Sequence, residues 1–138
     1  MFSQTAEYAL RAIITIAQRQ GITAQAISLE SHVPLDYLSK VLNLLGRAGI
    51  VRAQRGRGGG FTLASPAEQM TVLDVVNAVD PIRRIRSCPL QLKAHGTNLC
   101  PLHRKLDDAL ASVEAAFAAT PIAELCHQGV KECYVAIA

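Results

Sequence analysis

The feature that most constrains this chain is a glycine-rich basic stretch, Arg55-Gly56-Arg57-Gly58-Gly59-Gly60, which separates two short β-prone runs. The stretch is not expected in a helix, because each glycine in a helix interior costs about 1 kcal/mol relative to alanine. The flanking runs, residues 50–54 and 61–63, are too short for helices and contain β-branched and aromatic residues. Together they predict a β-hairpin that turns through the glycines.

Helical patterns precede the hairpin. Apolar residues at helical spacing predict a first helix over residues 5–19 and a short second helix over residues 24–31. Pro34 suits the first turn of a third helix, whose apolar stripe ends at Gly46 or Gly49. The second and third helices form a helix-turn-helix. Because the hairpin follows directly, the pattern predicts a winged helix with the arginines and glycines at the tip of the wing.

The rest of the chain is helical on either side of a long loop. Thr71 is positioned to cap a fourth helix that ends at Val79. Residues 80–100 contain prolines, glycine and several basic residues, which predicts a loop long enough to have a function. A long helix is then expected over residues 101–119, followed by a last helical turn over residues 120–125.

The predicted fold is mainly α, a winged helix-turn-helix with a two-stranded β wing and a long C-terminal dimerisation helix. We divide it into a DNA-binding domain (1–79), a sensor or cofactor loop (80–100), and the dimerisation helix with a C-terminal segment (101–138). The dimer is expected because the long helix carries an apolar stripe that the small winged-helix core does not need. The stripe consists of Leu102, Leu106, Leu110, Val113 and Phe117.

Composition narrows the possible partners. With 138 residues, no Trp, three Phe and three Tyr, the chain suits one small domain and lacks aromatic platforms for stacking on bases. We see neither a signal-peptide pattern nor an apolar run of about 18 residues that would span a bilayer. We therefore expect a cytoplasmic protein with no membrane partner and no small-molecule substrate, whose four Cys are reduced.

The positive charge is concentrated in the first half of the chain. The net charge is +3, and residues 1–60 contain seven basic and three acidic residues, so the remainder has a net charge of −1. A positive field over the predicted winged helix favours a polyanionic partner, double-stranded DNA.

Two groups of residues are candidates for DNA contact. At the wing tip, Arg55 and Arg57 supply charge suited to a narrow minor groove, and Gly58 and Gly59 allow close approach of the backbone. A flexible basic loop without a partner is the alternative. The start of the third helix would present residues to base edges and phosphates, although the Tyr equally suits packing and the Asp equally suits the helix dipole. These residues are Pro34, Asp36, Tyr37, Ser39 and Lys40.

Several segments resemble the Rrf2 family of bacterial transcription regulators, which includes the iron–sulfur cluster regulator and the nitric-oxide-sensing repressor. The resemblance covers about residues 1–125 and implies a homodimeric winged helix with crossing dimerisation helices and a cofactor loop before the long helix. Two positions depart from the family pattern, since His32 replaces the usual glycine of the helix-turn-helix turn and Ser39 replaces a frequent Glu. The segments that resemble the family are Tyr8-Ala9-Leu10-Arg11-Ala12, Tyr37-Leu38-Ser39-Lys40-Val41-Leu42, Leu45, Ala48-Gly49-Ile50-Val51, residues 55–64 and Asp74-Val75-Val76-Asn77-Ala78-Val79.

The loop carries candidate metal ligands. Cys88, Cys100 and His103 provide two thiolates and an imidazole, which suit an iron–sulfur cluster. The resemblance implies a third Cys midway between the first two, but Ala94 stands there with His95 beside it. It also implies a carboxylate from the start of the other subunit's first helix, a place that Glu7 holds.

We therefore consider a cluster held by Cys88 and Cys100, by Glu7 of the partner subunit, and by His103 or His95. Of the two cluster types, a 2Fe–2S cluster is expected over a 4Fe–4S cluster. A cluster-free thiol switch is the main alternative, with Cys126 and Cys133 as minor candidates, because exposed low-pKa thiols oxidise reversibly. Zinc, another effector or no cofactor also remain open, and the spacing matches no common zinc motif.

The sequence thus predicts a homodimeric transcription regulator, a repressor, that binds a pseudo-palindromic operator. It would sense redox, nitric oxide or iron–sulfur status through residues 80–103. An enzyme is disfavoured because we find no Ser/His/Asp set or carboxylate pair placed for catalysis. A protein–protein adaptor with the same fold would not need Arg55 and Arg57 on the wing.

Overall fold

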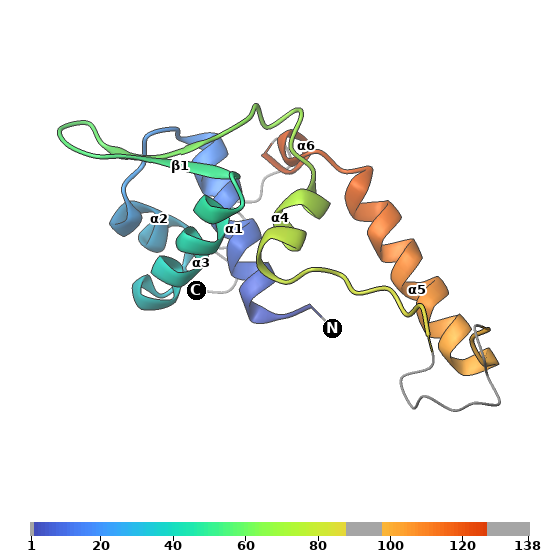
Figure 1. Ribbon diagram of the computed structural model, residues 1–138. Coiled ribbons are helices and arrows are strands. Elements are labelled where there is room, and N and C mark those ends of the chain that lie inside the picture. The colour runs from blue at the N-terminus through green and yellow to red at the C-terminus, as the bar shows by residue number, and fades with distance from the viewer. Residues whose placement is uncertain (1, 88–97, 127–138) are drawn as a thin grey trace.

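The computed structural model describes residues 2–87 and 98–126. It confirms a mainly helical chain with one two-stranded antiparallel sheet, the architecture of a winged helix (Figure 1). None of the described helices is both long and apolar enough to cross a membrane. The elements in chain order are α1 (Gln4–Gln18), α2 (Ala24–Ser31), α3 (Leu35–Arg47), β1 (Val51–Gln54), β2 (Gly60–Leu63), α4 (Val72–Val79), α5 (Pro101–Ala118) and α6 (Ile122–Cys126).

Short polar side chains cap three of the described helices, and the cap of α4 by Thr71 was predicted. The Ser3 hydroxyl accepts a hydrogen bond from the Ala6 amide at 3.1 Å at the start of α1. The Thr23 hydroxyl accepts a hydrogen bond from the Ala26 amide at 3.3 Å, so α2 starts directly after Thr23. Thr71 and Asp74 form a reciprocal capping box at the start of α4, with hydrogen bonds of 2.9 and 3.1 Å. Such caps satisfy amide groups that have no partner inside the helix.

The turn of the helix-turn-helix uses unusual backbone geometry at His32. This residue ends α2 in the left-handed conformation with φ of 56°, a region that costs a non-glycine residue free energy. His32 thus adopts this conformation at the turn position where the family pattern has glycine. Pro34 was predicted in the first turn of α3, but it precedes the helix as its N-cap and forms no side-chain hydrogen bond there. A proline ring cannot supply the acceptor that caps a helix.

The core lies where α1 packs against α2, α3, α4 and α6. Each helix contributes its apolar stripe, and burying these side chains is the dominant stabilising term of the fold. The return of α6 to this core was not foreseen from the sequence: Ile122 is fully buried, and its amide donates to the Met70 carbonyl at 2.7 Å. The largest fully buried side chains include Ile13, Ile16, Ile27, Leu38, Leu45 and Val75.

The wing is anchored by the loop between α1 and α2. Strands β1 and β2 pair in antiparallel register, with Val51 opposite Leu63 and Gln54 opposite Gly60. On the other side of β2, the Gly21 amide donates to the Phe61 carbonyl at 2.9 Å, and the Phe61 amide donates to the Ile22 carbonyl at 2.8 Å. The base of the wing therefore has backbone partners on both sides, which orients its tip.

At two of the three consecutive glycines, the fold itself requires the absence of a side chain. A β-carbon on Gly59 would lie 2.3 Å from the Gln54 carbonyl oxygen, and one on Gly60 would lie 2.4 Å from the Gly21 carbonyl oxygen. Neither position has room for any other residue unless the backbone moves. The sequence interpretation had explained the run by the hairpin turn and by close approach to DNA.

Helix α5 extends away from the body of the domain, on the side opposite the wing tip (Figure 1). None of its 18 residues is buried, and Leu102 and Leu106 are 63% and 47% exposed. Phe117, expected in the dimer stripe, packs instead against the core cluster, with its ring centroid 5.1 Å from that of Phe2. The apolar residues nearer the start of α5 are therefore not buried by the part of the chain that the structure describes.

Candidate nucleic-acid interface

The outer face of α3 is a polar stripe of four exposed residues. They are separated by four, three and four positions, so they lie on one side of the helix, opposite the apolar side chains that α3 buries. The sequence analysis had named only the first two. The helical period that identifies the buried stripe also identifies the other two. The stripe consists of Asp36, Lys40, Asn43 and Arg47.

The other predicted residues of this region lie beside that stripe. Pro34 is exposed immediately before α3. Ser39 is exposed on the wing side, where its hydroxyl donates to the Leu35 carbonyl at 3.1 Å. Tyr37 is half-buried on the opposite flank, its hydroxyl hydrogen-bonded to the Thr5 hydroxyl of α1. Among the candidate residues of this region, Tyr37 is thus the one that is partly buried by contacts within the chain.

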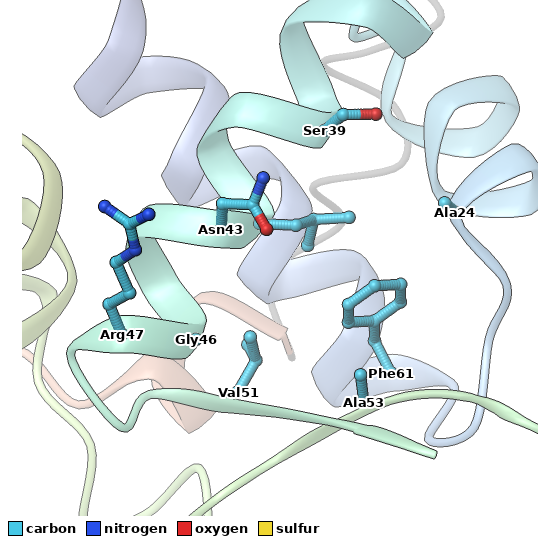
Figure 2. Close-up of a pocket in the computed structure, with 9 residues that line it drawn as sticks. Ala24, Ser39, Asn43, Gly46, Arg47, Val51, Ala53 and Phe61 are labelled. Atoms are coloured by element: carbon cyan, nitrogen blue, oxygen red, sulfur yellow. The ribbon is translucent and has the colours of Figure 1, made fainter. Parts of the chain in front are cut away.

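A cleft of about 500 Å³ separates α3 from the wing. Figure 2 shows Ser39, Asn43 and Arg47 along α3 on one side, with Ala53 and Phe61 of the wing on the other. The cleft is open and has polar groups on its helical side. Its walls are α3 and the wing, and both are open to solvent on the same side of the molecule, so an extended polyanion can contact both.

The wing tip presents exposed positive charge. Arg55 and Arg57 are exposed, as is Arg52 on β1. Gly56 and Gly58 have φ of 95° and 73°, so the turn depends on glycine at both positions. The predicted tip residues are therefore together in the turn, which Gly59 closes by donating from its amide to the Gly56 carbonyl at 2.9 Å.

The segment after α4 is fixed to α5 by a charged cluster. Arg84 donates two hydrogen bonds to Asp107, and the Ile85 amide donates a third at 2.8 Å. Arg84 also lies 3.7 Å from Glu114. The guanidinium and the amide together lower the pKa of Asp107 to about 2. Hydrogen bonds to a charged carboxylate are the strong kind, so this cluster holds the start of the predicted sensor loop against α5.

Two of the predicted metal ligands come together at the start of α5. Cys100 is the N-cap of the helix, and its Sγ lies 3.1 Å from Nδ1 of His103. Both side chains are partly exposed. Cys88 and His95 lie outside the described residues, so only this thiol–imidazole pair of the loop set has a described geometry.

Glu7 lies on the exposed side of α1. Its carboxylate pairs with Arg11 one turn later at 2.6 Å, and its side chain is 58% exposed. It is accessible to a second subunit, as the resemblance requires, but an ion pair within the chain already uses it.

Cys100 and His103 fit one side of an iron–sulfur or metal site, because they are soft donors on one helical turn. Within residues 2–87 and 98–126, no third His, Cys, Asp or Glu joins them. At Cys126, burial and secondarily the charge of Glu68 raise the pKa of the thiol. Cys133 lies outside the described residues.

The comparison with known proteins decides the family. The family model for Rrf2, described as an iron-dependent transcriptional regulator, matches residues 2–128. The chain belongs to the Rrf2 family. Among its relatives is a candidate HTH-type transcriptional regulator of Aquifex aeolicus, 26% identical over 130 residues, which covers 91% of this chain and 90% of the relative. A Neisseria meningitidis serogroup B relative of the same description is 30% identical over 104 residues, 70% of each chain.

Solved structures of similar proteins share the fold. CymR, the global cysteine regulator of B. subtilis, has a TM-score of 0.74 at 21% identity and covers 91% of this chain and 95% of its own. T. potens IscR has a TM-score of 0.75 at 19% identity, covering 91% and 85%. Staphylococcus aureus CymR has a TM-score of 0.69 at 25% identity, covering 91% and 97%. The candidate interface therefore lies on an Rrf2-family transcriptional regulator.

Proposed function

We propose that this Rrf2-family regulator is a repressor that binds a pseudo-palindromic operator as a homodimer and responds to a redox, nitric oxide or iron–sulfur signal through residues 80–103. The observation that carries the DNA-binding part is the pairing of a polar helical stripe with a basic wing across one open cleft. The observation that carries the sensing part is the Cys100–His103 contact at the start of α5.

The geometry supports a division of roles at the DNA. The outer stripe of α3 enters the major groove, where Asn43 suits hydrogen bonds to adenine and Lys40 suits a phosphate. Arg55 and Arg57 reach the adjacent minor groove from the wing. The sugar–phosphate strand between the two grooves then passes through the cleft, where Arg47 supplies a positive charge.

The dimer rests on the apolar residues of α5 that the chain leaves exposed. Leu102 and Leu106 belong to a helix with no buried residue. Two copies of this helix would cover each other and would set the distance between the two recognition helices. Successive half-sites lie about 34 Å apart, so a small change in the angle between subunits weakens operator binding.

The signal enters near the charged cluster of Arg84 and Asp107. Cys100 and His103, together with Cys88, Glu7 of the partner subunit and the alternative ligand His95, would hold a 2Fe–2S cluster. Such a cluster supplies one-electron redox chemistry and reactivity toward nitric oxide. Asp107 lies one helical turn after His103, so a change of ligation at the start of α5 acts next to the contact that holds the loop on this helix.

A thiol switch is the second candidate, favoured by the same pair. His103 Nδ1 lies within hydrogen-bonding distance of Cys100 Sγ, and an imidazole in this place can take the thiol proton before a peroxide oxidises the sulfur. Staphylococcus aureus CymR in its oxidised form, at 24% identity and a TM-score of 0.69, is among the structural neighbours.

The deciding experiment is the visible absorption spectrum of protein purified without oxygen, with iron and acid-labile sulfide measured on the same sample. We expect a coloured protein whose absorption is lost in Cys88→Ala and Cys100→Ala, weakened in Glu7→Gln and retained in Cys126→Ala. Protein that stays colourless after reconstitution with iron and sulfide would refute the cluster. Oxidation of Cys100 that tracks with release of DNA would then support the thiol switch.

A further inference from the structure

We propose that Tyr37 positions the recognition helix instead of contacting DNA, and that Thr5 and Tyr8 of α1 are the partners through which it does so. This inference rests on the proposed DNA-binding function and changes the role first expected of Tyr37. It concerns the end of α3 that enters the major groove, where a small rotation moves every base-contacting side chain.

The hydroxyl of Tyr37 already has a partner. It forms a hydrogen bond with the Thr5 hydroxyl, 32 residues earlier in the chain, and the bond is partly buried. A buried hydroxyl that loses its partner costs free energy. Tyr37 can donate to a phosphate only if the Thr5 hydroxyl is the donor of this bond, because a hydroxyl has a single proton to donate.

The ring of Tyr37 is held as well. It meets the ring of Tyr8 in an edge-to-face arrangement, with centroids 5.2 Å apart. Tyr8 is itself constrained, because its hydroxyl accepts from the Gln4 amide at 2.9 Å and the Arg11 guanidinium lies 5.6 Å from its ring centroid. Residues of α1 therefore hold both the hydroxyl and the ring of Tyr37.

The beginning of α3 needs such a contact. Pro34 stands at the N-cap and offers no side-chain hydrogen bond, so no local cap holds the first turn of this helix. Tyr37 is in that turn, on the flank that faces α1 and away from the wing. The tertiary contact with α1 substitutes for the missing cap and sets the direction in which α3 leaves the core.

The side of α3 on which a residue lies distinguishes a positioning role from contact with DNA. Asp36 and Lys40 lie on the exposed outer stripe, whereas Tyr37 is half-buried. Loss of the Tyr37–Thr5 bond should therefore leave the phosphate contacts intact and relax the angle at which α3 enters the groove. Specific binding, which depends on that angle, should suffer more than non-specific binding.

A double-mutant cycle tests the assignment with Tyr37→Phe, Thr5→Val and the double variant. The probes are a duplex selected by the wild-type protein from random sequence and an unselected duplex of equal length, each titrated at two or more salt concentrations. We expect both single variants to weaken binding to the selected duplex by a similar factor, about three- to tenfold. The double variant should be no weaker than either single variant, and the salt dependence should not change.

Thr120→Val is the matched control for Thr5→Val. It removes an exposed hydroxyl that donates to the Ala116 carbonyl at 2.9 Å, away from α3, so selected-duplex binding should stay within twofold of wild type. A melting temperature for each variant separates loss of stability from loss of positioning.

Three results would overturn the proposal. The first is weaker binding in Tyr37→Phe with no effect of Thr5→Val and a shallower salt dependence, which indicates a phosphate contact. The second is additive losses in the double variant, and the third is a lower melting temperature with unchanged affinity. Wild-type protein that selects no sequence and shows no salt-dependent binding would instead refute the proposed function itself.

Discussion

Arg84 binds the carboxylate of Asp107 through two parallel hydrogen bonds, from Nε to Oδ1 at 2.8 Å and from Nη2 to Oδ2 at 2.7 Å. The two residues are 23 positions apart, so the contact closes the chain segment that contains the predicted sensor loop. A bidentate pair of this kind fixes orientation as well as distance. The start of the loop is thereby held against α5.

This pair predicts an acid-sensitive loop. Because the pKa of Asp107 in the fold is about 2, below its ordinary value of 3.8, the pair stabilises the fold fully at pH values above the ordinary pKa. Its contribution is lost as the pH falls from about 4 to about 2. Hydrogen exchange at the Ile85 amide, which donates to Asp107, should accelerate in this window relative to exchange at the core of α1.

Substitutions give the matching test at neutral pH. Asp107→Asn should accelerate exchange at Ile85, whereas Asp108→Asn, an exposed neighbour, should leave it unchanged. Equal exchange rates in wild type and Asp107→Asn would show that the pair does not hold the loop.

Lys40 and Arg55 should affect DNA affinity in different ways. If Lys40 neutralises a phosphate, Lys40→Ala should reduce the slope of log K against log salt by about one unit on every sequence. If Arg55 enters a minor groove, Arg55→Ala should cost about 1–3 kcal/mol, mainly at A·T-rich positions. Fluorescence anisotropy titrations on selected and random duplexes measure both effects. Equal losses on the two duplexes for both variants would contradict the assignment of Arg55.

The exposed apolar side of α5 predicts how the chain assembles. Leu106→Asp with Leu110→Asp should give a folded monomer that no longer binds the operator specifically, because each Asp would place a charge in the helix-to-helix contact. Light scattering with circular dichroism reports both states. Leu29→Asp is the control, since this leucine on α2 is 79% exposed and should tolerate the charge. A double variant that remains dimeric would place the interface elsewhere.

Two glycines should respond to alanine in opposite directions. Gly46 lies inside α3, and a β-carbon added there would meet nothing within 4 Å, so Gly46→Ala should raise the free energy of unfolding by about 0.5–1 kcal/mol. Gly60→Ala should lower it by about 1–3 kcal/mol, because the new carbon meets the Gly21 carbonyl oxygen at 2.4 Å. Urea titrations of both variants measure the difference. An unchanged free energy of unfolding in Gly60→Ala would mean that the backbone at the base of the wing shifts at no cost to make room for the β-carbon.

Local signals in the sequence predicted most elements to within one or two residues. Thr71 and Asp74 cap α4 through hydrogen bonds three residues apart, which any helix beginning there would form. The glycines of the wing turn and the left-handed His32 follow the same logic, because their backbone conformations involve only neighbouring residues. The Pro34 prediction was wrong by one position because a proline fits both before and within a first turn.

What the sequence alone determined about this protein is therefore the order of helices and strands, the winged helix and the family to which the chain belongs. Periodicity, caps and turns depend on residues close together in the chain, so they can be recognised from the sequence without a structure. The tertiary structure alone decided which side chains meet: Tyr37 with Thr5, Arg84 with Asp107, and Ile122 with the core. These pairs are far apart in the chain, and their contacts depend on the angles at which helices pack, which no local pattern specifies.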